Sequence, residues 1–255
     1  MDIFAQIPTW TLVAAFAVTF LGGFVKGAVG FAMPLVMISG MGLFIDPYLV
    51  VAGIIIPILV TNLMQVLRGG LSEALAAARE HWLYITLVCS TIFISAQFLR
   101  LIPTNAMFVV LGVPVAALSL IQLVGLRFQI SPDKRRRFEI LAGLISGMLG
   151  GLAGTWGPPT VLYLLALNTP RAKQLVVQGV VYGLGAVTLF AGHIQSGVLN
   201  TGNWLFSVAL VLPAMLGMLA GFRAGNHMDQ DRFRRITLFV LMVAGLNLIR
   251  RGLIG

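Results

Sequence analysis

The sequence predicts an all-α polytopic membrane protein made of two pseudo-symmetric inverted repeats, and three observations lead to this prediction. They are a strongly apolar composition, a glycine pattern that occurs twice, and an uneven distribution of basic residues. The 255 residues are 58% hydrophobic and 10% charged, and their mean hydropathy is +0.97. Because soluble domains carry about 25% charged residues, most of this chain is expected to lie in a membrane.

Eight apolar stretches are long enough to cross a bilayer as helices, which takes about 17–25 residues. They cover residues 10–31, 47–67, 82–100, 104–125, 138–155, 174–194, 204–222 and 235–250. Two shorter apolar stretches, 32–45 and 158–167, have Pro34 and Pro158 near their start, where proline suits the first turn of a helix. These two are too short to cross, so we expect about eight full spans plus two broken, re-entrant hairpins.

The pattern G-x3-G-x2-G-x3-P occurs twice, 124 positions apart. The first copy is Gly23, Gly27, Gly30 and Pro34, and the second is Gly147, Gly151, Gly154 and Pro158. Such glycines either let neighbouring helices pack closely or mark helices that break to line a substrate cavity. The duplication and the prolines favour a site between two broken helices, with helix breaks assigned to Gly23, Pro34, Gly147, Gly151 and Pro158.

Basic residues indicate the orientation, since cytoplasmic loops of membrane proteins collect Lys and Arg. The chain has 17 basic and eight acidic residues, and the loop 127–137 holds one Lys and four Arg. This loop is predicted to be cytoplasmic, as are the Arg-containing loops 68–81 and 223–235, whereas the uncharged loop 194–204 is external. Half-repeat one (about 1–126) then starts outside and half-repeat two (about 137–255) starts inside, within one transporter domain that covers 1–255.

Lys26 is a charged side chain that this layout places well inside the membrane, within the first glycine motif. A cation at that depth costs about 2.5–3.5 kcal/mol on insertion scales. In one reading Lys26 faces a wet cavity and binds an anion. In the other it snorkels to the outer surface or bonds backbone carbonyls that the helix break has freed. Its counterpart in the second motif is Gly150, so the cation has no symmetric mate.

Further candidates for a substrate site lie at the two breaks, where backbone N–H groups and the positive ends of half-helices suit an anion. These substrate-binding candidates are Gly27, Gly30 and Phe31 at the first break and Gly154, Thr155, Trp156 and Gly157 at the second. Polar side chains that share a helical face are predicted to complete the lining, namely Asn62 with Gln65 and Gln178 with Tyr182. The alternatives are core packing for Trp156 and hydrogen bonding between helices for the four polar residues.

No enzymatic activity is predicted. His81, His193 and His227 lie at span ends or in a loop, and no cluster with metal-ligand spacing occurs, so neither a metal nor another cofactor is expected. The sequence also has no catalytic triad order, no paired carboxylates at membrane depth and no P-loop. The basic residues are not interleaved with aromatic ones, which excludes a nucleic-acid surface.

In its duplicated motif and predicted topology the chain resembles the TauE/SafE (TSUP) family of sulfite and organosulfonate exporters. Members have two homologous halves, each opened by a G-x3-G-x2-G-x-G-G-type motif, and the resemblance covers essentially the whole chain. The first copy departs from the pattern, because Phe31, Ala32 and Met33 replace small or glycine residues and Lys26 is inserted. The resemblance implies a secondary carrier of small sulfur-containing anions that is linked to protons.

These observations together predict a transporter that exports sulfite, thiosulfate, sulfoacetate or related organosulfonates across the inner membrane. Its partners are the anionic substrate, the lipid bilayer and protons as the coupling ion. Without a buried Asp, Glu or His, coupling would have to use Lys26, the substrate itself, or nothing. Two alternatives are a small-anion channel and a carrier of carboxylates that contain no sulfur.

Overall fold

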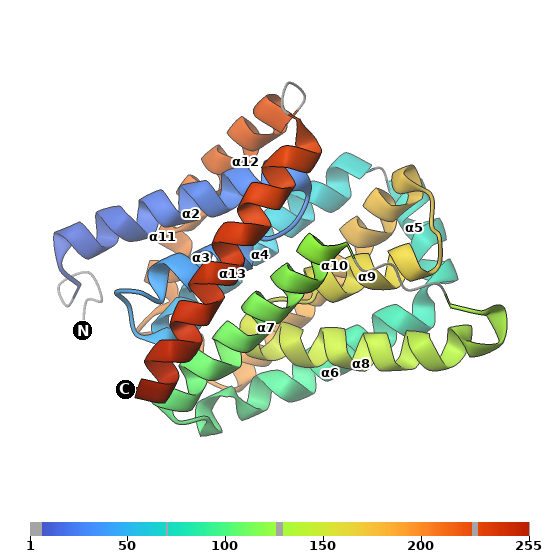
Figure 1. The fold of residues 1–255 in the computed structure, drawn as a ribbon. Helices are drawn as coiled ribbons and strands as arrows, with labels where there is room; N and C mark the ends of the chain where they lie inside the picture. The colour runs from blue at the N-terminus through green and yellow to red at the C-terminus, as the bar shows by residue number, and fades with distance from the viewer. Residues whose placement is uncertain (1–6, 70, 126–129, 226–228, 255) are drawn as a thin grey trace.

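The computed structural model describes residues 7–69, 71–125, 130–225 and 229–254, which form helices and no strand (Figure 1). The α-helices are α2 (Thr9–Val29), α3 (Met33–Met41), α4 (Pro47–Gly69), α5 (Leu71–Glu80), α6 (Trp82–Phe98), α7 (Thr104–Val124), α8 (Arg135–Ala153), α9 (Gly157–Ala166), α10 (Arg171–Gln195), α11 (Trp204–Ala209), α12 (Val211–Gly225) and α13 (Gln230–Ile254). Two short 3-10 helices, η1 (Leu99–Leu101) and η2 (Pro132–Lys134), follow α6 and precede α8. The prediction of an all-α protein is therefore confirmed.

Seven helical segments in the described part of the chain are long and apolar enough to cross a membrane. They are Thr9–Val29, Pro47–Leu67, Trp82–Leu101, Thr104–Val124, Val176–Gln195, Trp204–Gly225 and Arg235–Ile254. The eighth predicted span, 138–155, forms most of α8, but that helix begins with three arginines and includes Glu139, so it is less apolar than the others. The chain is a multi-pass membrane protein.

One predicted loop was wrong, and one predicted span is interrupted within its length. Residues 68–81 were expected to be a loop but contain α5, whose sequence LSEALAAARE is rich in strong helix formers. The predicted span 204–222 is divided between α11 and α12 at Leu210. The cause is Pro213, which has no N–H to donate to the carbonyl of Ala209 four residues earlier.

Both predicted half-helices exist, and each folds back along the helix before it. Helix α3 returns along α2, so that the rings of Trp10 and Phe44 lie with their centroids 5.9 Å apart. Helix α9 returns along α8, and the ring of Tyr163 lies 6.3 Å from that of Phe138. Each half-helix has a proline in its first turn, Pro34 in α3 and Pro158 in α9, as the sequence predicted.

The glycines of the repeated motif have two distinct roles. Gly30 (φ 88°) and Gly154 (φ 62°) end α2 and α8 in the left-handed conformation that glycine adopts without strain. The other glycines lie inside continuous helices, so the prediction of helix breaks at Gly23, Gly147 and Gly151 was wrong. A Cβ atom on any of the three would collide with the backbone of a neighbouring helix, so these positions serve close packing. Packing glycines and the helix-ending glycine belong to the same motif, and only the third glycine marks the break.

The two halves of the chain are intertwined rather than separate. Helix α2 packs most extensively on α12, and α8 packs in the same parallel manner on α6 (Figure 1). Because α2 and α8 carry the two glycine motifs, each motif helix packs against a helix of the opposite half. The other extensive contacts between long helices, α7 with α13 and α10 with both α6 and α4, also join one half to the other.

The bundle has two distinct ends. The start of α2 and the end of α13 lie together, because Trp10 contacts Phe44 and Arg251 donates to the carbonyl of Gly42. Figure 1 shows the start of α8 at the opposite end, which we call the basic face for its exposed residues Lys134, Arg135, Arg136 and Arg137.

Candidate functional site

The two helix breaks, far apart in sequence, meet around one cavity. The first break supplies Phe31, Ala32 and Pro34, and the second supplies the segment 154–158. The empty volume is about 360 Å³, and the full lining is Lys26, Phe31, Ala32, Pro34, Leu35, Asn62, Gly154, Thr155, Trp156, Gly157, Pro158 and Tyr182. The cavity therefore lies between the two re-entrant hairpins, where the motif duplication predicted a site.

Lys26 is the only charged residue among the described residues that line this cavity, and it is 3% exposed. Its Nζ donates to Oγ1 of Thr61 over 3.0 Å and also to Oδ1 of Asn62, both on α4. The Thr61 hydroxyl in turn donates to the carbonyl of Pro57 at 2.7 Å. Lys26 therefore neither snorkels to the surface nor depends on the carbonyls of a broken helix.

The geometry leaves the ammonium able to bind a ligand. An ammonium has three N–H donors, and the two bonds to α4 leave one for a group in the cavity. The acceptors on α4 are neutral, so the positive charge of Lys26 is not cancelled by an acid there. Lys26 also lies in the last turn of α2, where the negative end of the helix dipole favours a cation.

Both half-helices direct their N-termini at the cavity. Each N-terminus carries a partial positive charge of roughly half an elementary charge, which favours an anion nearby. The first residues of α3 and α9 lie in the cavity lining, and each half-helix is long enough to form more than two full turns. The arrangement thus places two helix dipoles and one ammonium around one space.

Backbone donors at the second break are fewer than the sequence suggested. The N–H groups of Gly154 and Thr155 cap α8 by donating to the carbonyls of Gly150 (2.7 Å) and Leu149 (3.4 Å). Pro158 and the following Pro159 have no N–H. Between residues 154 and 159, this leaves the N–H groups of Trp156 and Gly157 to act as backbone donors toward a ligand.

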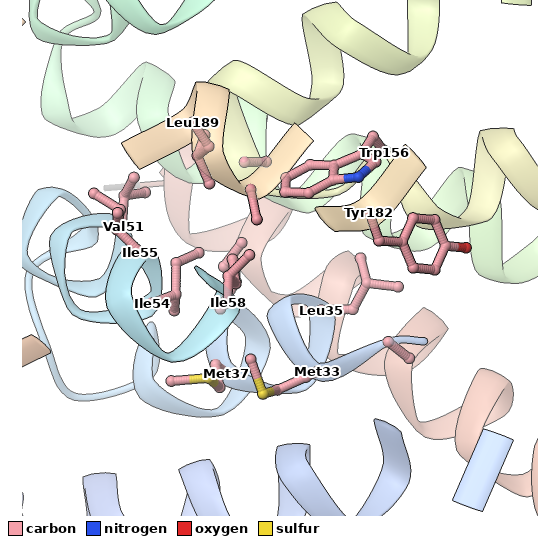
Figure 2. Close-up of a cluster of buried hydrophobic side chains, with 14 of the residues drawn as sticks. Met33, Leu35, Met37, Val51, Ile54, Ile55, Ile58, Trp156, Tyr182 and Leu189 are labelled. Atoms are coloured by element: carbon pink, nitrogen blue, oxygen red, sulfur yellow. The ribbon is translucent and has the colours of Figure 1, made fainter. Parts of the chain in front are cut away.

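Aromatic rings form the walls of the cavity on the side of α10. Tyr182 donates its hydroxyl to the carbonyl of Gly157 at 3.1 Å, which ties α10 to the start of α9. Figure 2 shows Trp156 and Tyr182 on one side of a buried apolar cluster, with Met33 and Met37 of α3 on the other. This cluster gives the cavity an apolar surrounding, in which the Lys26 charge is screened less than at a surface.

Most of the predicted substrate-site residues come together here. Eight line the cavity, namely Lys26, Phe31, Asn62, Gly154, Thr155, Trp156, Gly157 and Tyr182. Four do not: Gly27 faces the backbone of α12, Gly30 caps α2, Gln65 donates to the carbonyl of Gly30 at 3.4 Å, and Gln178 is buried elsewhere. Sequence reasoning did not assign Ala32 or Leu35 to the site, and it treated Pro34 and Pro158 only as helix-starting residues.

His81 and His193, which lie at the ends of membrane-length helices, are both buried. His81 is 2% exposed and His193 is fully buried, whereas His227 lies outside the described residues. No group of three or more His, Cys, Asp or Glu side chains in the described ranges is arranged to hold a metal ion. The cavity lining includes no histidine or acid from these ranges.

Comparison with known proteins gives one match. A family model described as "Sulfite exporter TauE/SafE" matches residues 15–248, a range that includes every residue in the cavity lining. No curated protein and no solved structure matches the chain.

Proposed function

The chain belongs to the sulfite exporter TauE/SafE family, and on this premise we propose that it is a secondary carrier that exports small sulfur-containing anions across the inner membrane. The substrates are sulfite, thiosulfate, sulfoacetate or related organosulfonates. The observation that carries this proposal is the single cavity where the Lys26 ammonium and the N-termini of α3 and α9 converge.

The lining suits a compact oxyanion better than a large or hydrophobic solute. Lys26 supplies a full charge and a remaining N–H donor, and the two helix N-termini supply partial positive charge. Phe31, Trp156 and Tyr182 supply walls that limit the size of the ligand. A sulfite or sulfonate group has three oxygens around one sulfur, so it can accept from several of these donors at once.

Each motif helix packs against a helix of the opposite half, and this reciprocal packing supports an inverted repeat and a rocking mechanism. In such carriers one repeat moves against the other around a fixed site, so that access alternates between the two sides. The basic face is placed in the cytoplasm, because it carries the cluster Lys134–Arg137. A straight pore through the protein is not needed for this mechanism.

The test is binding and counterflow with purified protein in proteoliposomes. The panel contains sulfite, thiosulfate, sulfoacetate, taurine, acetate and sulfate, and the proteins are the wild type, Lys26→Met and the control Lys134→Met on the exposed basic face. We expect saturable binding and counterflow of a sulfur anion that Lys26→Met abolishes and Lys134→Met preserves. Saturation by acetate alone would instead identify a carboxylate carrier. Anion conductance without saturable counterflow would identify a channel.

A further inference from the structure

A group of buried polar side chains connects the half-helix α9 to the basic face. At its centre is Tyr163 of α9, whose hydroxyl lies 3.1 Å from Oε1 of Glu139 and 3.2 Å from Nδ1 of His81. His81 lies between α5 and α6 and is 2% exposed. The ring of Tyr84 stacks on Tyr163 with centroids 4.1 Å apart and fixes its position.

The hydrogen atoms in this group can be assigned by counting donors. A carboxylate only accepts, so the single hydroxyl hydrogen of Tyr163 goes to Glu139. Nδ1 of His81 must then donate to the Tyr163 oxygen, which makes Nε2 the nitrogen that gains or loses a proton. Nε2 is buried, has no hydrogen-bond partner in the part of the chain that the structure describes, and lies 3.9 Å from Oε1 of Glu80.

The charged side chains around His81 affect whether it is protonated, and so does the pH at the basic face. Glu80 and Glu139 favour the imidazolium, while Lys173 and Arg135 oppose it. Burial dominates and lowers the pKa of His81 below its ordinary value, so the resting imidazole is neutral. Protons have a short path to it, because Glu80 and Glu139 line an open depression on the surface of this face.

Protonation would change a contact that joins two helices. Glu80 at the end of α5 now pairs with Lys173 at the start of α10, at 2.6 Å. A proton on Nε2 of His81 gives Glu80 a second cationic partner close by and weakens its hold on Lys173. Helix α10 carries Tyr182, and α9 carries Trp156 and Gly157 at its start, so both affected helices supply walls of the anion cavity.

We propose that His81 is a proton-binding site at the basic face, through which protonation loosens α9 and α10 and accelerates anion exchange. The proton comes from water in the depression and returns to it, with no other reactant. This inference rests on the proposed transport function. It requires neither a proton gradient nor a titratable group inside the cavity.

The test is sulfite or thiosulfate exchange in proteoliposomes with equal pH on both sides, between pH 5 and pH 8. The wild-type rate is expected to rise as the pH falls, by at most about tenfold per pH unit, which is the slope of one titrating group. In His81→Gln the exchange rate should be slow and should not vary with pH. Glu80→Gln removes the pair with Lys173, so its exchange rate should be fast and should not vary with pH either. His227→Gln is the control and should keep the wild-type profile.

The outcomes are distinct. A wild-type rate that does not vary with pH, or an unchanged profile in His81→Gln, would overturn the proposal while leaving the transport function intact. If the wild type exchanges no anion, the transport function fails instead. The proton site is then tested by NMR of histidine-labelled wild-type protein, where a His81 ring signal that does not shift between pH 4 and pH 8 refutes it and a titrating signal supports it. If His81→Gln does not fold, the same NMR spectrum of the wild-type protein shows whether His81 binds a proton.

Discussion

Nζ of Lys26 donates to Oγ1 of Thr61 over 3.0 Å, and the two equivalent positions in the second half cannot form such a pair. The counterparts of these residues, 124 positions later, are Gly150 and Gly185. The indole of Trp156 packs against both glycines, because a Cβ on Gly150 would meet Cε3 at 3.2 Å and one on Gly185 would meet Nε1 at 3.0 Å. An aromatic ring thus fills, in one half, the space in which the other half holds a hydrogen-bonded cation.

The first prediction concerns the neutral acceptors of Lys26. Asn62→Asp keeps the shape of the side chain but pairs the ammonium with a carboxylate, which cancels the charge available to an anion. We expect anion binding to be lost although the protein remains folded, as calorimetric titration with thiosulfate and thermal melting will show. Asn247→Asp, beside Arg250 on α13, makes the same chemical change away from the cavity and should bind normally. Normal binding by Asn62→Asp would show that the Lys26 charge does not hold the anion.

The second prediction uses the contact between Gly185 and Trp156. A methyl group at Gly185 would lie 3.0 Å from the indole and force it to move by a few tenths of an ångström. We expect Gly185→Ala to cost about 1–3 kcal/mol, as overpacking usually does, and to weaken anion binding because Trp156 lines the cavity. Gly179→Ala on the same helix is the matched control, since its nearest neighbour is Cα of Val66 at 3.9 Å. Equal affinities of the two variants would contradict the assignment of Trp156 to the wall.

The third prediction tests the packing role of the first motif glycine. A Cβ at Gly23 would collide with the carbonyl of Ala214 on α12, and backbone cannot move aside as a flexible side chain can. Gly23→Ala should therefore destabilise the protein by about 1–3 kcal/mol, despite the better helix propensity of alanine. Thermal melting in detergent measures this, again with Gly179→Ala as the control. A melting temperature equal to that of the control would mean that α2 and α12 are not in close contact.

The spans and the two half-helices could be predicted because they follow from local features of the sequence. Apolar length identifies a crossing helix, and Pro34 and Pro158 each mark the start of a short helix after a glycine. The convergence of the two breaks was also predictable, since a repeated motif in an inverted arrangement brings equivalent positions together. Lys26 was found as a charge at membrane depth and Tyr182 as a polar residue on the same helical face as Gln178, and the two lie 156 positions apart.

Features that depend on contacts between distant helices could not be predicted. In the sequence, a motif glycine has the same appearance whether it packs against another helix, as Gly27 does, or ends its own helix, as Gly30 does. Gln65 was expected in the site because it shares a helical face with Asn62, but its side chain reaches the Gly30 carbonyl instead. His81 was placed at a span end, and it is buried in contact with Tyr163 of α9, which lies 82 positions later in the chain.

The fourth prediction concerns the orientation of the two ends of the bundle. Thr9 and Asn200 are exposed away from the basic face, and Lys134 is exposed on it. In a Cys89→Ala background, single cysteines at positions 9 and 200 should react with an impermeant maleimide added outside cells. A cysteine at position 134 should react only after the membrane is opened. Reaction of positions 9 and 134 from the same side would rule out the inverted arrangement of the two halves.

The last prediction concerns a proline inside a membrane helix. Pro57 of α4 has no N–H, so the carbonyl of Gly53 loses its partner within the helix. Ser207 of α11 replaces that partner, because its Oγ donates to Gly53 at 2.9 Å and accepts from the N–H of Ile56 at 3.1 Å. Ser207→Ala leaves the Gly53 carbonyl unsatisfied in an apolar interior and should cost about 1–2 kcal/mol.

The control for this prediction is Pro57→Ala, which restores an N–H that can reach Gly53 within the helix. Ser207→Ala should therefore cost less in the Pro57→Ala background than in the wild type. Thermal melting of the four proteins forms a double-mutant cycle that isolates this coupling. Equal costs in the two backgrounds would mean that Ser207 does not compensate for the proline, and that the Gly53 carbonyl is satisfied in another way.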